Sequence, residues 1–370
     1  MIIFVESNLE IMRKILYGLA LLAAVACGAD CDEFDGICRQ CFPEGEPGAA
    51  VIVTRGGRTL FSACYGIADT GTFAPVTERT AFNIASISKQ FTAAAVMQLA
   101  EAGLLSLDDP MQKYFPEYTD PLWGKVQIRH LLSHSSGIPD KRNYPREVKI
   151  KGDDNLAVEY MQTLSELNFE PGSRYQYINP TYVLLGKLVE RVSGEPFEDY
   201  MREHVFGPAG MTRTQYFGPE KDIADMAHAY EKDAEGRWCE LDYGEDTFFA
   251  TRPDGGIYTG TADMAKWIPA LLAGKVVSKE SLEAMWTPQI SISGDEWDPD
   301  GTGDGQWYGY GFIIGRHDGL ERICHSGGNG AFRSFEAYYP QSGTLFVVLA
   351  ARSDWDRDAI TAAVEEIFLK

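Results

Sequence analysis

Basic residues are scarce in this 370-residue sequence. It contains 33 lysines and arginines against 54 aspartates and glutamates, which gives a formal net charge of −21. An acidic chain of this kind is a poor partner for nucleic acids and for anionic membrane surfaces. With 45% hydrophobic and 24% charged residues, the composition is that of a globular protein with one large domain or two modest ones.

The sequence also lacks an apolar run long enough for a comfortable transmembrane helix. The strongest candidate, MRKILYGLALLAAVAC, starts at Met12 with two basic residues close behind and ends in small residues. This three-part layout is typical of a secretory signal, and its apolar part is too short to span a bilayer easily. It predicts a signal peptide over residues 1–26, with Met12 as an alternative start, and an exported bacterial protein.

Cys27 follows this signal at the place where a lipoprotein would carry its lipid-modified cysteine. Ala24 stands where such signals usually have a larger aliphatic residue, so lipid anchoring at Cys27 and simple cleavage both stay open. We expect residues 27–44 to form a tether, and the protein to be periplasmic or lipid-anchored.

Complete metal-binding patterns are missing. Cys38 and Cys41 form a C-x-x-C pair, but no second pair and no histidine follows at zinc-finger spacing, so disulfides or free thiols are favoured. His130 and His134 are four residues apart in HLLSH, yet the glutamate of H-E-x-x-H is absent. A G-x-S-x-G elbow is absent as well, which argues against an α/β-hydrolase.

No internal repeat and no linker rich in proline or serine divides the chain. Apolar runs favour strands at both ends, whereas residues 105 to 240 follow mostly a helical period, with a glycine stop at Gly194. The strand-like runs are residues 49–55, 60–66, 308–316, 333–340 and 344–351, and a final helix is expected over 358–370. This order predicts an α/β fold with one sheet built from both chain ends and an inserted helical region, in a single catalytic domain over 45–370.

The apolar helix expected over residues 82–105 carries Ser86 and Lys89 near its start. Side chains three apart share a helix face, so the lysine amine would lie beside the serine hydroxyl. A desolvated, neutral lysine can take the proton of a serine and make it a nucleophile. The helix N-terminus would favour the negative charge that develops during attack.

Tyr177 and Asn179 lie in a turn before the next clear helix. In an extended stretch, residues two apart face the same way, so the phenol and the amide would point together. A tyrosine whose pKa is lowered by cationic neighbours can shuttle protons, and an asparagine can orient a lysine and a substrate.

His325 precedes Gly327 and Gly328 between two strand-like runs. A polar side chain at such a strand edge can bind an acyl substrate, and glycines let the substrate backbone approach closely. Backbone N–H groups at Ser86 and near Gly328 could then form an oxyanion hole.

The three motifs, in this order, resemble those of the serine β-lactamase and penicillin-binding protein superfamily. The stretches IRHLLSHSSGIP and GGIYTGTADMAKW are similar to its class C β-lactamase, D-alanyl-D-alanine peptidase and esterase branch. The resemblance runs from about residue 45 to 370. It implies a β-lactamase-like sandwich, in which an antiparallel sheet is flanked by helices and carries an inserted all-helical region.

By this resemblance, Ser86 is the acylated nucleophile, Lys89 its basic partner and Tyr177 a second proton shuttle. Asn179 would position lysine and substrate, and His325 stands where many members have lysine. The resemblance implies a serine hydrolase that acts through an acyl-enzyme on D-amino-acid peptides, esters or amides. A class C-type β-lactamase and a catalytically weak β-lactam-binding or sensor protein are the alternatives. The resemblance requires no metal and no cofactor. The sequence does not indicate an oligomeric state.

Overall fold

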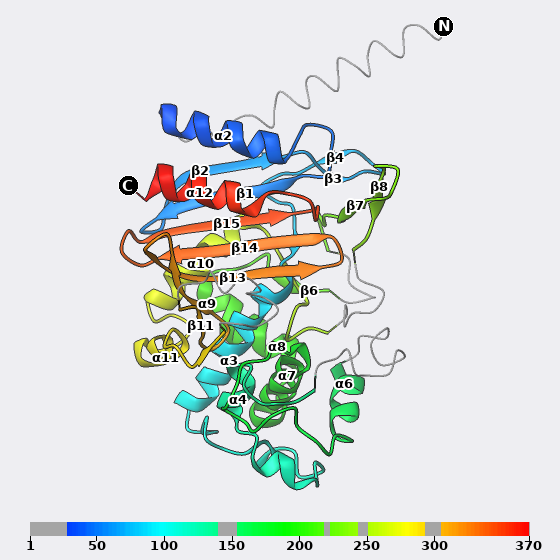
Figure 1. The fold of residues 1–370 in the computed structure, drawn as a ribbon, viewed down its shortest axis with the longest axis vertical. Coiled ribbons are helices and arrows are strands. Elements are labelled where there is room, and N and C mark those ends of the chain that lie inside the picture. Colours follow the sequence, from blue (N-terminus) through cyan, green and yellow to red (C-terminus); the bar gives the residue numbers. More distant parts are fainter. Residues whose placement is uncertain (1–27, 140–153, 218–222, 243–250, 293–304, 370) are drawn as a thin grey trace, which may run out of the picture.

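The computed structural model describes residues 28–139, 154–217, 223–242, 251–292 and 305–369. Its centre is an eight-stranded antiparallel sheet in the order β10-β11-β12-β13-β14-β15-β1-β2 (Figure 1). The strands are β1 (Ala49–Arg55), β2 (Arg58–Tyr65), β10 (Ile290–Ser291), β11 (Trp307–Tyr308), β12 (Ile313–His317), β13 (Leu320–Asn329), β14 (Phe332–Tyr339) and β15 (Thr344–Ala350). The first strand therefore pairs with the last, and the predicted sheet from both chain ends is confirmed.

The strands at the middle of the sheet are apolar on both faces because both faces are covered. In β15 every residue is buried, and in β1 only Arg55 is exposed. Ile52 lies opposite Val347 on one side and Ser62 on the other. Such strands read as continuous apolar runs rather than alternating ones, which is why the sequence predicts them well.

Helices α2 (Ala29–Cys41) and α12 (Arg357–Phe368) cover one face of the sheet (Figure 1). Phe34 of α2 is fully buried, with its ring centroid 4.9 Å from that of Phe61 and 5.3 Å from that of Phe368. The tether expected over residues 27–44 is therefore wrong for most of its length. Its apolar residues recur at helical spacing and bury one side of a helix against the sheet.

The helical layer lies on the opposite face of the sheet and contains the inserted helical region (Figure 1). Its core helix is α3 (Ser88–Glu101), which is preceded by the short helix η1 (Ala85–Ile87). The others are η2 (Met111–Lys113), η3 (Pro121–Gly124), α4 (Ile128–Leu132), α6 (Asp154–Met161), α7 (Asn179–Ser193), α8 (Phe197–Tyr200), the π-helix η5 (Met201–Phe206), α9 (Gly207–Ala209), α10 (Thr261–Leu272) and α11 (Lys279–Met285). Helix α7 ends at Gly194 in the left-handed conformation, as its glycine stop predicts.

Short strands complete the fold, and three of them, β6, β7 and β8, interrupt the region predicted to be mostly helical. They are β3 (Ile67–Asp69), β4 (Ala74–Pro75), β5 (Phe82–Asn83), β6 (Gln215–Tyr216), β7 (Tyr230–Lys232), β8 (Trp238–Glu240) and β9 (Ile257–Thr259). Strand β9 pairs with both β5 and β6. This small sheet joins the segment just before η1 to a strand far along the chain.

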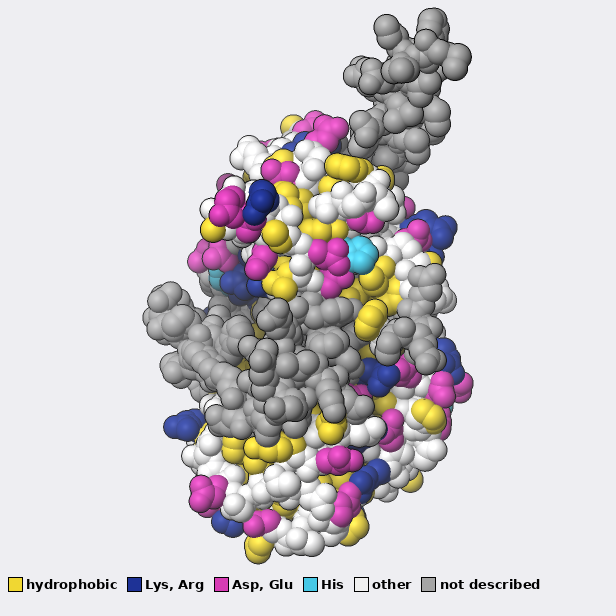
Figure 2. Space-filling view, turned by 90° about the vertical axis from the view of Figure 1, so that its right-hand side faces the viewer, with side chains coloured by type: hydrophobic (Ala, Val, Ile, Leu, Met, Phe, Trp, Pro, Cys, Tyr) yellow, Lys and Arg dark blue, Asp and Glu magenta, His cyan; other side chains and the backbone are white. Residues whose placement is uncertain are grey.

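The surface agrees with an acidic globular protein. On the face in Figure 2, acidic side chains are spread among apolar ones, and basic side chains are scattered. Across the described residues, no helix is both long and apolar enough to cross a membrane. The expected signal peptide over 1–26 and Cys27 lie outside the described residues.

Candidate active site

Ser86 lies in η1, at the start of the buried helix α3. The residue before it, Ala85, has a φ of 46°, a left-handed conformation that is rare for a residue with a side chain. The Oδ1 atom of Asn83 accepts a hydrogen bond of 2.8 Å from the Ala85 N–H and supports this turn. Backbone strain of this kind persists only where surrounding contacts hold it, and it occurs often at functional sites.

Lys89 is fully buried, and its ammonium group meets three acceptors. Its Nζ lies 3.1 Å from Ser86 Oγ, 2.8 Å from Asn179 Oδ1 and 2.8 Å from the carbonyl oxygen of Asp254. Three acceptors match the three N–H donors of an ammonium, which explains how a charged lysine is tolerated in the interior. When the amine loses one proton, the same 3.1 Å contact lets Nζ accept the hydroxyl proton of Ser86.

Tyr177 and Asn179 converge on the same lysine, as their spacing predicts. Ile178 between them is extended, and the Lys89 Nζ lies 4.9 Å from the centroid of the Tyr177 ring. Burial raises the pKa of Tyr177, and a hydrogen bond with Ser86 opposes this shift. We expected cationic neighbours to lower this pKa, but burial dominates it, and the opposing contribution comes from Ser86 rather than from a cation. The phenol therefore rests in its neutral form, as a proton donor.

His325 lies on β13, facing the helical layer, and is buried. Its Nδ1 lies 2.6 Å from the carbonyl oxygen of Ser326, so Nδ1 carries the proton that it donates there. Nε2 then accepts a hydrogen bond of 3.0 Å from the Tyr308 hydroxyl. Burial, reinforced by the charge of Lys89, lowers the pKa of His325 to about 3, so the ring is neutral.

Gly327 brings β13 against η1. A Cβ built at Gly327 would lie 2.2 Å from the carbonyl oxygen of Ile84 and 2.3 Å from Ser334 Oγ, so no side chain fits there. A Cβ at Gly328 would instead meet the Arg333 guanidinium at 3.4 Å. Of the two glycines named from the sequence, Gly327 is thus the one that packs against the turn carrying Ser86.

Among the described strands, the part of β13 beside this turn has a partner strand on one side only. The pairing of β13 with β12 ends at Cys324, whereas its pairing with β14 continues to Asn329. Backbone N–H and C=O groups along an unpaired edge can bind an extended peptide-like ligand as an added strand.

Sequence reasoning missed three parts of the site. Asp254 contributes only a backbone carbonyl, which no side-chain pattern reveals. Tyr308 lies within a run that was read only as a strand. His134 was considered only as half of a zinc pattern, but its ring centroid lies 4.3 Å from that of Tyr177.

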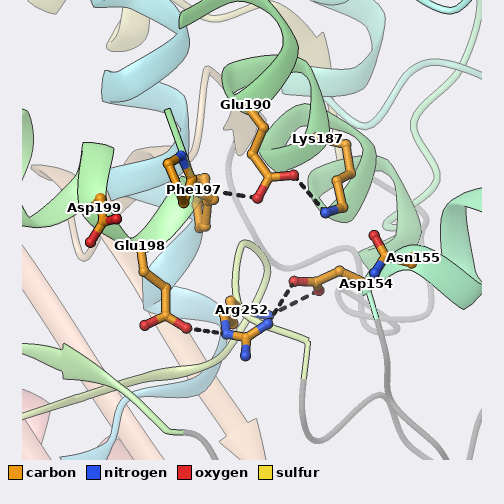
Figure 3. A pocket seen from close by; sticks show the side chains of 9 residues that line it. Asp154, Asn155, Lys187, Glu190, Phe197, Glu198, Asp199 and Arg252 are labelled. Carbon is orange, nitrogen blue, oxygen red and sulfur yellow. Dashed lines mark hydrogen bonds and ion pairs between the residues drawn. The ribbon is translucent and has the colours of Figure 1, made fainter. Parts of the chain in front are cut away.

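A polar pocket adjoins the segment that supplies the Asp254 carbonyl (Figure 3). The Arg252 side chain forms ion pairs with Asp154 and Glu198, and the Asp154 carboxylate also accepts the backbone N–H of Arg252 at 3.2 Å. Thr92 donates a hydrogen bond of 2.6 Å to the carbonyl oxygen of the intervening Pro253. These contacts hold the segment from which the Asp254 carbonyl reaches Lys89.

Three groups of described side chains could hold a metal ion, and none includes a residue that contacts Ser86. They are Glu195, Glu203 and His204; His228, Glu240 and Asp242; and His317, Asp318 and Glu365. The histidine of each group has a carboxylate partner in its own group, at 3.1, 2.8 and 2.9 Å respectively. The first two are also the contacts expected of ordinary surface ion pairs, whereas Glu365 of the third is buried.

Comparison with known proteins agrees with this geometry. The chain is 29% identical over 335 residues to penicillin-binding protein 4* of Bacillus subtilis, covering 86% of this chain and 71% of the relative. It spans 62% and 59% of the length of two further curated relatives. The structure of an octameric penicillin-binding protein homologue from Pyrococcus abyssi matches with a TM-score of 0.79 at 30% identity, over 91% of this chain and 77% of that one.

The fold is also that of a D-amino acid amidase from Ochrobactrum anthropi, with a TM-score of 0.74 at 22% identity, over 91% of this chain and 98% of that one. The sequence matches the Beta-lactamase family over residues 39–367. These similarities confirm the β-lactamase-like fold that the motifs imply. The chain belongs to the β-lactamase family, within the serine β-lactamase and penicillin-binding protein superfamily of serine hydrolases and acyl-transferases.

Proposed function

We propose that the protein is an exported serine hydrolase that forms an acyl-enzyme at Ser86, with D-amino-acid peptides, esters or amides as substrates. The observation that carries this proposal is the 3.1 Å contact between Lys89 Nζ and Ser86 Oγ. A buried amine at that distance is positioned to act as the base that a serine nucleophile requires.

The chemistry follows from the positions of the three side chains. Lys89 acts as the base once its ammonium group has released one proton to solvent. Ser86 Oγ attacks the substrate carbonyl carbon, and its proton passes to this neutral amine. Tyr177, whose ring lies beside Lys89 and which is neutral at rest, donates its proton to the leaving alcohol or amine as the scissile bond breaks. Lys89 then returns a proton to the phenolate. A water molecule attacks the acyl carbon, which releases the acid and restores the Ser86 hydroxyl.

The open edge of β13 supplies the binding surface in this proposal. A substrate amide would pair with the backbone beyond Cys324, and its carbonyl oxygen would receive the Ser86 N–H and a second backbone N–H near Gly328. Gly327 allows β13 to lie close enough to η1 for both groups to reach one carbonyl.

Neutral His325 favours substrates that lack a free carboxylate. We expected its side chain to bind the acyl substrate, but Ser326 and Tyr308 already occupy both of its nitrogens. A fixed ammonium at this position would attract a carboxylate, whereas a buried neutral ring does not. This favours esters and amides over β-lactams that bear a carboxylate, and the D-amino acid amidase with the same fold supports that class.

The test compares kcat/KM for a neutral p-nitrophenyl ester and a chromogenic cephalosporin in the original protein and in His325→Lys. We expect the original protein to turn over the ester at least as well, and the variant to shift towards the cephalosporin. His204→Lys, which changes a half-exposed histidine, is the matched control and should leave the ratio unchanged.

The alternatives predict other outcomes of the same test. A strong preference of the original protein for the cephalosporin would favour the class C-type β-lactamase. A stable adduct on Ser86 without turnover of either substrate would favour the β-lactam-binding or sensor protein.

Export is a separate part of the proposal, supported by the layout of the first 26 residues. The intact mass of the protein purified from its native host tests it. A mature form that begins near Cys27, with or without attached lipid, is expected, and a full-length cytoplasmic product would contradict export.

A further inference from the structure

His134 holds the backbone on both sides of Tyr177. Its carbonyl oxygen accepts a hydrogen bond of 2.9 Å from the Gln176 N–H, and its Nδ1 accepts one of 3.2 Å from the Ile178 N–H. The two amides that flank the tyrosine are therefore bound to one residue from a different segment of the chain.

The imidazole ring also supports the phenol directly. Its centroid lies 4.3 Å from that of Tyr177, 4.8 Å from that of Tyr308 and 5.1 Å from that of Tyr182. The residue is fully buried, so solvent does not compete for these contacts. Contact with three rings fixes the plane of the imidazole and leaves the Tyr177 ring little freedom to turn.

The backbone of His134 adopts an unusual conformation. Its φ is 54°, which asparagine, aspartate and histidine tolerate better than other residues with a side chain. Since Nδ1 accepts a hydrogen bond, the ring proton of the neutral form lies on Nε2. Burial and the charge of Lys89 lower the pKa of His134, so the neutral form persists at physiological pH.

We propose that His134 is a positioning residue for Tyr177: its Nδ1, carbonyl oxygen and ring together hold the phenol in reach of Ser86. This inference rests on the proposed acyl-enzyme function of Ser86. His134 itself exchanges no proton with the substrate in this role. It acts by restricting where the Tyr177 hydroxyl can lie, and displacement by about 1 Å is enough to slow a reaction about 100-fold.

Two substitutions separate the acceptor from the ring. His134→Phe keeps an aromatic ring and removes Nδ1. His134→Asn removes the ring but places Oδ1 close to the position of Nδ1, and asparagine also tolerates the positive φ. We expect His134→Phe to lower kcat for a p-nitrophenyl ester about 10- to 100-fold with little change in KM. We expect His134→Asn to retain activity within about fivefold of the original.

His130→Phe is the matched control. His130 lies one helical turn earlier, and its Nδ1 also accepts a backbone N–H, that of Gln127 at 3.2 Å, but this contact caps helix α4. Its loss should affect thermal stability without changing kcat by more than about twofold. If His134→Phe does not fold, His134→Met serves as the variant that lacks the acceptor.

A double-mutant cycle with Tyr177→Phe distinguishes positioning from a general effect on stability. Because His134 acts through the phenol, removing Nδ1 should have almost no further effect on kcat once the Tyr177 hydroxyl is absent. A fully additive loss would overturn the inference, and so would a folded His134→Phe with normal kcat. Labelling of Ser86 by a fluorophosphonate is measured in parallel. Failure of the original protein to label would refute the proposed function, and the inference with it.

Discussion

Replacing Lys89 by methionine removes its Nζ as the base for Ser86 and as the hydrogen-bond donor to Asn179 and Asp254. Activity reports the first role and stability reports the second. Methionine keeps the length and apolar character of the side chain but has no Nζ. Ser86 then loses its proton acceptor, and the oxygens of Asn179 and Asp254 lose a donor. Loss of a positioned proton shuttle typically slows a reaction 10²- to 10⁴-fold, which corresponds to an increase in the barrier of about 3 to 5 kcal/mol.

The effect on folding should be smaller because two contributions oppose each other. Each buried acceptor left without a hydrogen bond costs about 1 to 3 kcal/mol. Removing a fully buried charge relieves a desolvation penalty of similar size. We therefore expect Lys89→Met to fold, with a Tm within a few degrees of the original.

The assay is the pre-steady-state burst and steady-state rate with a p-nitrophenyl ester, together with the rate of inactivation by a fluorophosphonate. Both rates should fall together, since both depend on the nucleophilicity of Ser86. Lys113→Met, which breaks an exposed pair with Asp109, is the control and should leave both rates unchanged. A folded Lys89→Met that retains more than about a third of the original rate would refute the role of the lysine as a base.

Two further predictions concern the sheet beside the site. Gly327→Ala should lower both Tm and the acylation rate, because its methyl group would lie 2.2 Å from the Ile84 carbonyl oxygen. Thermal melting and ester hydrolysis measure the two quantities. Unchanged values would show that β13 moves away without consequence. Burial raises the pKa of Glu336 to about 8 from 4.5, so the stability that its protonated form contributes is lost as the pH rises through this range. Glu336→Gln should therefore gain about 3 to 5 kcal/mol relative to the original between pH 4.5 and 8 in denaturant unfolding, and a gain that does not depend on pH would contradict this.

The large sheet could be predicted because its strands are apolar on both faces and lie near the chain ends. Helix α2 could not, since it is only 13 residues long and carries several charges among its buried residues. Its stability comes from packing against Phe61 and Phe368, which are far away in the sequence. Tertiary contacts of this kind leave only a weak local pattern.

The site also has parts that local sequence predicts and parts that depend on tertiary contacts. Short spacings pair Ser86 with Lys89 on a helix start and Tyr177 with Asn179 on an extended turn, and these two pairs could be predicted. The contact between the pairs, from Lys89 to Asn179, comes from tertiary folding. The contact of His325 with Tyr308 was not predictable, because Tyr308 lies on β11, which β12 separates from β13 in the sheet.

Mapping the acylated residue tests the central claim most directly. The protein is treated with a fluorescent penicillin and, separately, with a fluorophosphonate, and the modified peptide is identified by mass spectrometry. If Ser86 is the nucleophile, at least one of the probes gives a single modification on Ser86, and this modification is lost in Ser86→Ala. A label on another serine, or no covalent label with either probe, would contradict the assignment of Ser86 as the nucleophile.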